Sequence, residues 1–224
     1  MTIILTLAWF SACFVYYGLL LLLPTILAQN TQTSYNFKYI SLIVISLVEM
    51  LCFYFSRAVM DHPALGRKKS TYIGFAVVGV CSAILMMLQE DQMYLLLAMF
   101  FIMKIFITTT FMTLYPYSAE IYATLIRGRA MGVFSLAGRI ATALLGFLGV
   151  NALYWMDGNG LYFIFMCLCL FSAFSVTRMP YCTLGRPLDS WSILQKGLFF
   201  SKISISNNNL YHSIHIQICI FIIF

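Results

Sequence analysis

The sequence predicts an all-α, polytopic membrane protein folded as a six-transmembrane-helix bundle. Of its 224 residues, 62% are hydrophobic and only 9% are charged, whereas a soluble domain has about 45–50% apolar and about 25% charged residues. The mean hydropathy is +0.92. The apolar residues form long continuous runs, which favours helices over a membrane β-barrel. At roughly 20 residues per crossing, these runs allow about six spans in a lipid bilayer, and they exclude a soluble fold.

The first span is expected at residues 3–27 and ends in the polar stretch 29–36. No Lys or Arg precedes Lys38, so the basic start of a signal peptide is missing and we interpret this segment as a true span. The second span is expected at about 39–58. It is followed by a basic loop, residues 61–69, which contains Pro and Gly and is too polar to stay in hydrocarbon.

The last four spans complete one transmembrane domain, residues 1–189. They are expected at about 72–88, 93–115, 130–153 and 161–177. Residues 190–224 have a different composition, with polar runs and no clear amphipathic period. We expect this tail to be cytoplasmic and outside the working fold, either disordered or a product of gene-model error.

Basic residues in the short loops are distributed unequally between the two sides of the predicted bundle. The loops after the odd-numbered spans contain only Lys38, whereas the loops after the even-numbered spans contain Arg67, Lys68, Lys69, Arg127, Arg129, Arg178 and Arg186. Loops rich in Lys and Arg stay in the cytoplasm. The sequence therefore predicts that both chain termini are cytoplasmic, and it explains the net charge of +6 without nucleic-acid binding.

Several function classes are not supported by any residue pattern. The seven cysteines are scattered, mostly inside apolar runs, and indicate no disulfide framework. The three histidines lie outside the spans, and no nucleophile with a base, phosphate loop or metal cluster is found. We expect neither an enzyme nor a metal or cofactor site.

Three charged residues inside the spans are the most informative, because such a charge costs about 2.5–3.5 kcal/mol at the centre of a bilayer. Glu49 lies near the middle of the second span, Lys104 near the middle of the fourth and Arg139 in the inner half of the fifth. Each must face protein or water. Polar residues lie one helical turn from each charge, namely Ser46 near Glu49, Thr108 near Lys104, and Ser135 and Thr142 near Arg139.

Two interpretations of these charges remain open. In the first, they line a polar pathway in which Lys104 or Arg139 attracts an anionic group and Glu49 binds a cation or a proton. In the second, Glu49 neutralises Lys104 at a similar depth and holds two helices in register. Tyr16 and Tyr17, in the middle of the first span, are expected to place at least one hydroxyl on a cavity or a neighbouring helix.

Small residues are concentrated in the fifth span. They include Gly132, Ala137, Gly138, Ala141, Ala143 and Gly146. Small residues spaced one turn apart allow helix backbones to approach closely. We expect close packing here, with a rocking interface as the alternative.

Four short motifs, in the order expected of one family, carry a resemblance. Asp61 with Gly66, Arg67, Lys68 and Lys69 resembles the Asp-x-x-Gly-Arg-Lys loop signature of the major facilitator superfamily. The stretch 117–124 with Arg127 is similar to the Pro-Glu-x-Tyr-Pro-Thr-x-x-Arg motif of its organic-ion, synaptic-vesicle-related and sugar porter branches. Residues 180–188 are similar to the Pro-x-Glu-Thr-x-Gly-Arg ending of these branches. The fourth motif, Trp-Phe at 9–10 with Tyr-Tyr-Gly at 16–18, resembles the seventh helix of the synaptic-vesicle-related branch.

The resemblance implies the carboxyl-terminal half of a twelve-helix transporter in a plasma or vesicle membrane, which carries a small solute such as an organic ion. Alternating access needs two six-helix bundles. The chain is then either a fragment of an incomplete gene model or a half that pairs with a second half or with its own copy. The alternative function is a transport-inactive half that acts as a membrane interaction or regulatory subunit.

The resemblance also assigns roles to individual residues. Lys104 is the preferred substrate-facing residue, followed by Glu49 and Arg139, with Tyr16, Tyr17 and Thr108 on the same pathway. On the inner side, Asp61 is expected to accept hydrogen bonds from the start of the fifth span and to attract Arg127 as a latch. Glu120 and Arg186 are expected to form a second charge network there. A solvated loop that serves only topology is the alternative for these inner-side residues.

Overall fold

The computed structural model describes residues 1–29, 35–62, 65–87, 93–122, 124–155 and 159–179. These residues form six α-helices, each containing a segment long and apolar enough to cross a bilayer. The helices are α1 (Thr2–Gln29), α2 (Tyr35–Asp61), α3 (Gly66–Met87), α4 (Met93–Ile121), α5 (Thr124–Trp155) and α6 (Asn159–Thr177). The predicted six-helix, all-α bundle is confirmed. The tail, including Arg186, lies outside the described residues.

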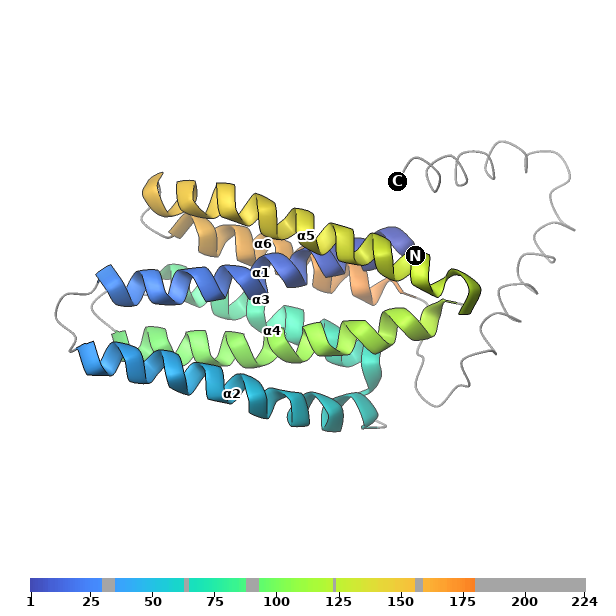
Figure 1. Ribbon diagram of the computed structural model, residues 1–224, viewed down its shortest axis with the longest axis horizontal. Helices are drawn as coiled ribbons and strands as arrows, with labels where there is room; N and C mark the ends of the chain where they lie inside the picture. Colours follow the sequence, from blue (N-terminus) through green and yellow to red (C-terminus); the bar gives the residue numbers. More distant parts are fainter. Residues whose placement is uncertain (30–34, 63–64, 88–92, 123, 156–158, 180–224) are drawn as a thin grey trace, which may run out of the picture.

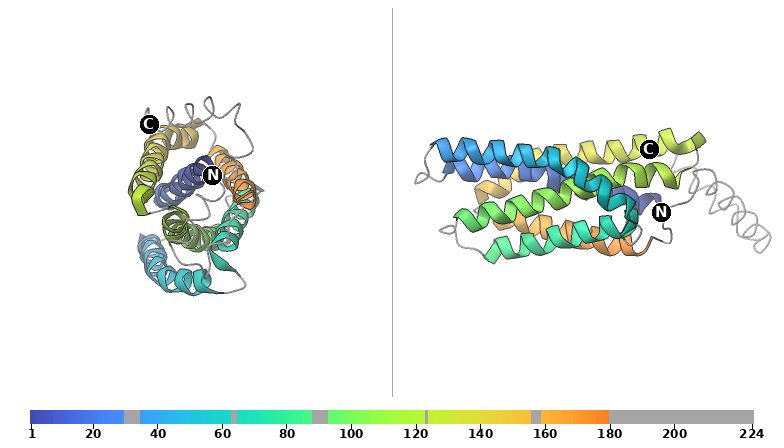
Figure 2. Two further views of the ribbon diagram at one scale, coloured as in Figure 1. Left: turned by 90° about the vertical axis from the view of Figure 1, so that its right-hand side faces the viewer. Right: turned by 90° about the horizontal axis from the view of Figure 1, so that it is seen from below.

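The helices lie side by side and run along the long axis of the bundle (Figure 1). Viewed along that axis, α5, α1, α4 and α2 follow one another in an arc, and α6 and α3 lie on the outer side of α1 and α4, to the right in the left-hand view (Figure 2). The helix contacts agree with this order, because α1 packs on α5, α4 and α6, and α4 packs on α2 and α3. The helices α2 and α5 form the two ends of the arc.

The helices extend beyond the predicted spans at several ends. Helix α3 begins at Gly66 and α5 at Thr124, six residues earlier than expected in each case, and α4 continues to Ile121. A window of apolar residues detects only the part of a helix that lies in hydrocarbon, whereas backbone hydrogen bonding continues into the polar interface. The prediction that residues 67–69 belong to a loop is therefore wrong, because they form the first turn of α3.

The short turn between α2 and α3 explains the glycine of the loop motif. Gly66 has a φ of 62°, in the left-handed region that glycine adopts without a steric penalty. The backbone N–H groups of Leu65 and Gly66 both donate to the carbonyl of His62, at 3.2 and 3.0 Å. Any side chain at position 66 would strain this turn.

Two other glycines allow close helix crossings. A Cβ placed on Gly74 of α3 would lie 1.8 Å from Oγ1 of Thr110 on α4, and one on Gly18 of α1 would lie 2.3 Å from the Phe165 ring on α6. These separations are far below van der Waals contact, so the helices can approach this closely only because both side chains are hydrogen atoms. The bundle core fills the remaining space with apolar side chains such as Phe75, which is fully buried.

Candidate functional site

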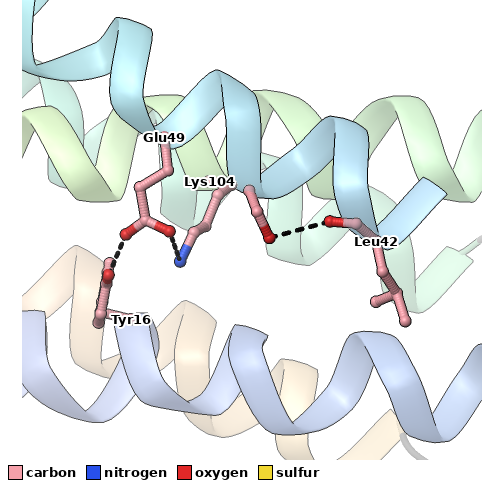
Figure 3. Close-up of polar contacts among 5 residues, drawn as sticks. Tyr16, Leu42, Glu49 and Lys104 are labelled. Atoms are coloured by element: carbon pink, nitrogen blue, oxygen red, sulfur yellow. Dashed lines mark hydrogen bonds and ion pairs between the residues drawn. The ribbon is translucent and has the colours of Figure 1, made fainter. Parts of the chain in front are cut away.

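A cluster of three polar side chains joins α1, α2 and α4 inside the membrane-spanning part of the bundle (Figure 3). Nζ of Lys104 on α4 lies 3.3 Å from Oε2 of Glu49 on α2. The hydroxyl of Tyr16 on α1 donates to Oε1 of the same carboxylate. Lys104 Nζ also lies over the Tyr16 ring, 3.9 Å from its centroid. The ammonium is thus stabilised by a carboxylate and by an aromatic face.

The two charges of this cluster differ in their exposure. The side chain of Lys104 is 4% exposed, whereas that of Glu49 is 21% exposed. An ion pair removes the net charge that the hydrocarbon would otherwise oppose. The carboxylate is therefore the more exposed charged group of the pair.

Aromatic rings surround the cluster on the α1 and α4 sides. The Tyr16 ring stacks on Phe111 with centroids 5.6 Å apart, and it meets Tyr17 edge-on at 5.2 Å. Phe111 in turn contacts Tyr115 at 5.2 Å. Tyr17 and Tyr115 are 41% and 44% exposed. Aromatic faces next to an accessible carboxylate form an environment suited to an organic cation.

The predicted polar neighbours of the cluster behave differently from one another. Thr108, one turn after Lys104, is fully buried, and its Oγ1 has no hydrogen-bond partner within the described residues. Ser46, one turn before Glu49, is exposed. Its hydroxyl donates to the carbonyl of Leu42, labelled in Figure 3, at 2.9 Å. Thr108 therefore belongs to the buried surroundings of the cluster, whereas Ser46 does not contact the carboxylate.

The structure does not bring Arg139 into this cluster. Arg139 and Ser135 lie on the exposed side of α5. The opposite side of α5 packs on α1, where a Cβ on Gly138 would lie 2.7 Å from Sγ of Cys13. Thr142 donates to the carbonyl of Gly138 at 2.6 Å. Sequence spacing predicted these polar neighbours on one helix but could not indicate which side of α5 faces the bundle.

A second charged group lies where α3, α4 and α6 come together at one end of the bundle. Arg67 and Glu120 form an ion pair of 2.8 Å. The Lys68 ammonium donates to the carbonyls of Thr177 and Met179, at 3.1 and 2.5 Å. Since the last carbonyls of a helix have no partner within it, Lys68 caps the end of α6.

Other inner-side predictions are only partly covered by the described residues. Arg127 Nη2 donates to the carbonyl of Tyr122 at 3.4 Å, and Glu120 contacts Arg67, a partner that the sequence did not predict. The side chain of Asp61, like the whole of Arg186, lies outside what the structure describes. Burial raises the pKa of the Tyr122 phenol, which donates to Thr2 Oγ1 at 2.8 Å.

Two hydrogen bonds that hold α1 were missed from the sequence. The Trp9 indole N–H donates to Ser118 Oγ on α4 at 2.8 Å, and Ser172 Oγ on α6 donates to Ser11 Oγ at 2.6 Å. The presence of Trp9 in an apolar span could have predicted one of them, because a buried indole N–H needs a hydrogen-bond acceptor. Which helix supplies the acceptor depends on helix rotation, which residue spacing on a single helix does not reveal.

The described residues contain no group of three or more His, Cys, Asp or Glu side chains able to hold a metal ion. The candidate chemistry is therefore that of the ion pair, the tyrosine hydroxyl and the aromatic rings around them.

Comparison with known proteins agrees with this geometry. A family profile described as "Sugar (and other) transporter" matches residues 1–194. The Drosophila melanogaster "Carcinine transporter" is 29% identical over 160 residues, which are 71% of this chain and 22% of the relative. The Arabidopsis thaliana "Organic cation/carnitine transporter 7" is 27% identical, covering 84% of this chain and 38% of the relative.

The Bos taurus "Synaptic vesicle 2-related protein" is also 27% identical, over 85% of this chain and 37% of its own length. The chain thus spans between about a fifth and two fifths of the length of these relatives. Its six membrane-spanning helices and the family match agree with the resemblance carried by the loop motifs. The chain belongs to the sugar (and other) transporter family of the major facilitator superfamily.

Proposed function

We propose that the chain is one six-helix half of a secondary carrier, which moves a small organic-ion solute across a membrane by alternating access. The observation that carries this proposal is the ion pair between Lys104 and Glu49 inside the membrane-spanning part of the bundle. Ionisable residues inside transmembrane segments face protein or a polar pathway and mark substrate or ion routes. Family membership supports transport as the general activity.

The asymmetry of the pair favours a solute with a cationic group. Glu49 is the more exposed partner, the Tyr16 hydroxyl donates to it, and the Tyr17 ring meets the Tyr16 ring edge-on. A cationic amine would pair with Glu49 and contact the rings, and it would release Lys104 to an anionic group of the solute. The names of two relatives contain carcinine and organic cation/carnitine. Carnitine, which has one quaternary ammonium and one carboxylate, offers both charges and is the first solute to test.

A complete carrier needs a second bundle, because alternating access rocks one bundle against another around a shared site. The matched part is only 22% of one relative and 38% of the other. We propose that the second half is six further helices of the same protein, of which this chain is a fragment, or else a separate six-helix unit or a second copy of this chain. Both chain termini would be cytoplasmic, in accord with the basic residues of the loops after α2, α4 and α6.

We further propose that the network of Arg67 and Glu120 closes the cytoplasmic end of the carrier in one of its states. The two residues join the first turn of α3 to the end of α4. Asp61 and Arg127 would extend this latch toward α5. An interaction that exists in only one state shifts the balance between states by its own free energy.

Uptake of labelled carnitine by cells that express the 224-residue chain tests the proposal, with carcinine as a second solute. We expect saturable uptake above that of vector cells. Glu49→Gln and Lys104→Ala should abolish it, because each removes one charge of the pair. Ser46→Ala is the matched control on α2 and should leave uptake unchanged.

Equal uptake in Glu49→Gln and unaltered protein would reject the cluster as the solute site. The second candidate function is that of a transport-inactive membrane interaction or regulatory subunit. Stable association with a membrane partner and no flux for either solute would support that function and reject the carrier.

A further inference from the structure

Helices α3 and α6 lie side by side and run in opposite directions (Figure 2), and two contacts define their register. In the first turn of α3, the Lys68 ammonium donates to the carbonyls of Thr177 and Met179 at the end of α6. About three turns further along α3, a Cβ on Gly79 would lie 3.1 Å from the Leu170 side chain. The beginning of α3 is therefore level with the end of α6.

Four exposed side chains lie along the line where α3 and α6 meet at this end of the bundle. On α3, Tyr72 lies two helical turns before Gly79 and therefore on the same face as that glycine. On α6, Phe174 lies one turn after Leu170. A basic residue lies one further turn toward each helix end, and because of the register these two are level with each other. We call this set the basic surface, and it consists of Lys69, Tyr72, Phe174 and Arg178.

The Arg178 side chain is held at the edge of the membrane-spanning part of α6, Gly160–Thr177. Its backbone N–H donates to the Ser175 carbonyl at 3.2 Å, so the chain at this position still follows the helical path. Its guanidinium carbon Cζ lies 4.9 Å from the centroid of the Phe174 ring, one turn closer to the bilayer. A cation packed on an aromatic face in this way remains at the depth of the lipid headgroups.

The carboxylates that the structure describes are engaged in ion pairs on other helices. Glu49 pairs with Lys104 inside the bundle, and Glu120 pairs with Arg67 at 2.8 Å. Neither carboxylate belongs to the exposed faces of α3 and α6, where the charged residues next to the rings are both basic. The electrostatic potential over the basic surface is therefore positive and favours an anionic ligand.

The two rings of the basic surface select among anionic ligands. Tyr72 is 41% exposed and Phe174 is 57% exposed, and both lie on the bilayer side of the two cations. Aromatic residues at this depth contact lipid at the membrane–water interface. A free phosphate ion would contact the cations and leave the rings uncovered. A phospholipid offers a phosphate to the cations and acyl chains to the rings.

We infer that the basic surface binds one anionic phospholipid of the leaflet at this end of the bundle. The phosphate lies between Lys69 and Arg178, whose guanidinium can donate two parallel hydrogen bonds to it, and the acyl chains lie along Tyr72 and Phe174. A zwitterionic lipid such as phosphatidylcholine would bring an ammonium next to the two cations, so a lipid with net negative charge is preferred. The inference goes beyond the proposed function, because it needs neither a solute nor a second bundle.

Photo-crosslinking to labelled lipids tests this inference. The full chain is reconstituted in nanodiscs of phosphatidylcholine with a minor fraction of phosphatidylglycerol, each lipid carrying its own radiolabel. Benzoylphenylalanine replaces Phe174 in one variant and, as the matched control, the exposed Phe163 near the other end of α6. We expect the ratio of phosphatidylglycerol to phosphatidylcholine crosslinked at position 174 to exceed that at 163 by about five-fold for each cation, the effect of one basic side chain near an anionic membrane surface.

Substitutions of the cations, made in the variant with the crosslinker at position 174, identify the site. Lys69→Gln and Arg178→Gln should each lower the phosphatidylglycerol ratio by about five-fold, and the double variant should return it to the ratio of the nanodisc. Lys69→Arg keeps a cation and should retain the enrichment, which distinguishes a lost charge from a misfolded chain. Arg129→Gln, which removes an exposed cation of α5 at the same end of the bundle, should change nothing.

Equal lipid ratios at positions 174 and 163, or an enrichment that persists in the double variant, would overturn the inference. A loss in Arg129→Gln as large as in Arg178→Gln would also overturn it, because the enrichment would then reflect the general charge of this end of the bundle. Inorganic phosphate distinguishes a lipid from a free anion. If it removes the enrichment while chloride of the same ionic strength does not, the basic surface binds phosphate ions and not a phospholipid.

Discussion

At the scale of single residues, Lys104 is a buried cation whose stabilisation depends on a neighbouring helix. Its ammonium is 3.3 Å from the Glu49 carboxylate and 3.9 Å from the Tyr16 ring centroid. Removing the carboxylate leaves the ammonium in a low-dielectric surrounding with only the ring and distant water. Such orphaned charges cost more than the pair itself contributes.

The double substitution of this pair should therefore destabilise the bundle less than the single substitution of Glu49. Glu49→Leu is expected to lower the free energy of unfolding by about 3–5 kcal/mol, the usual penalty for an uncompensated buried charge. The double variant Glu49→Leu/Lys104→Met should regain most of this loss, because it removes both charges. Unfolding of the purified chain in detergent, followed by circular dichroism, measures both.

The result for the double variant decides whether the pair is needed for stability. A double variant that is as unstable as Glu49→Leu would show that the pair stabilises the bundle beyond neutralising itself. A Glu49→Leu variant as stable as the unaltered chain would show that Lys104 does not depend on the carboxylate, which would contradict the geometry of the cluster.

The sequence predicted part of this cluster. It indicated that Glu49 and Lys104 lie at similar depth, because both fall near the middle of long apolar segments. Tyr16 was expected on the same pathway, but neither its hydrogen bond to Glu49 nor the separation of Arg139 from the pair was predicted. Both depend on how each helix is rotated about its axis, which is determined by packing against neighbours. The roles of these residues in transport remain proposals.

At the scale of helices, crossings are determined by a few positions without side chains. The approach of α3 to α4 at Gly74 leaves no room for a methyl group, since a Cβ there would lie 1.8 Å from Thr110 Oγ1 and 3.3 Å from the Phe106 carbonyl oxygen. Gly146 on α5 has open space at the same position. The same change at the two glycines should therefore have different consequences.

We expect Gly74→Ala to destabilise the bundle by about 1–3 kcal/mol, the usual cost of overpacking. Gly146→Ala, the matched control, should be neutral or stabilise by up to about 1 kcal/mol because alanine favours helix. Adding Thr110→Ala to Gly74→Ala should restore part of the loss. Thermal unfolding in one detergent compares the four proteins, and equal midpoints for the two glycine variants would contradict the close crossing.

Helix boundaries were predictable only for the hydrocarbon-spanning parts. The number and order of helices followed from the long apolar runs, but the first turn of α3 consists of basic residues that apolar patterning treats as a loop. Lys68 lies in that turn and caps α6 through the carbonyls of Thr177 and Met179. A cap formed by a residue more than a hundred positions away leaves no local signal in the sequence.

At the scale of the whole molecule, the helices α5, α1, α4 and α2 form an arc. The cluster of Glu49, Lys104 and Tyr16 lies where α1, α2 and α4 meet, whereas Arg139 lies on the exposed side of α5 at one end of the arc. Arg139 thus lies in a different part of the bundle from the cluster. The fold class and the family were predicted from composition and loop motifs, whereas this division required the arrangement of helices in space.

We propose that the cluster on α1, α2 and α4 binds the transported solute. Equilibrium binding of labelled carnitine to the purified chain tests it most directly, by scintillation proximity and without any need for flux or a second bundle. We expect saturable binding that Glu49→Gln abolishes and Ser46→Ala leaves intact. Binding of equal affinity in Glu49→Gln and in the unaltered chain would contradict it.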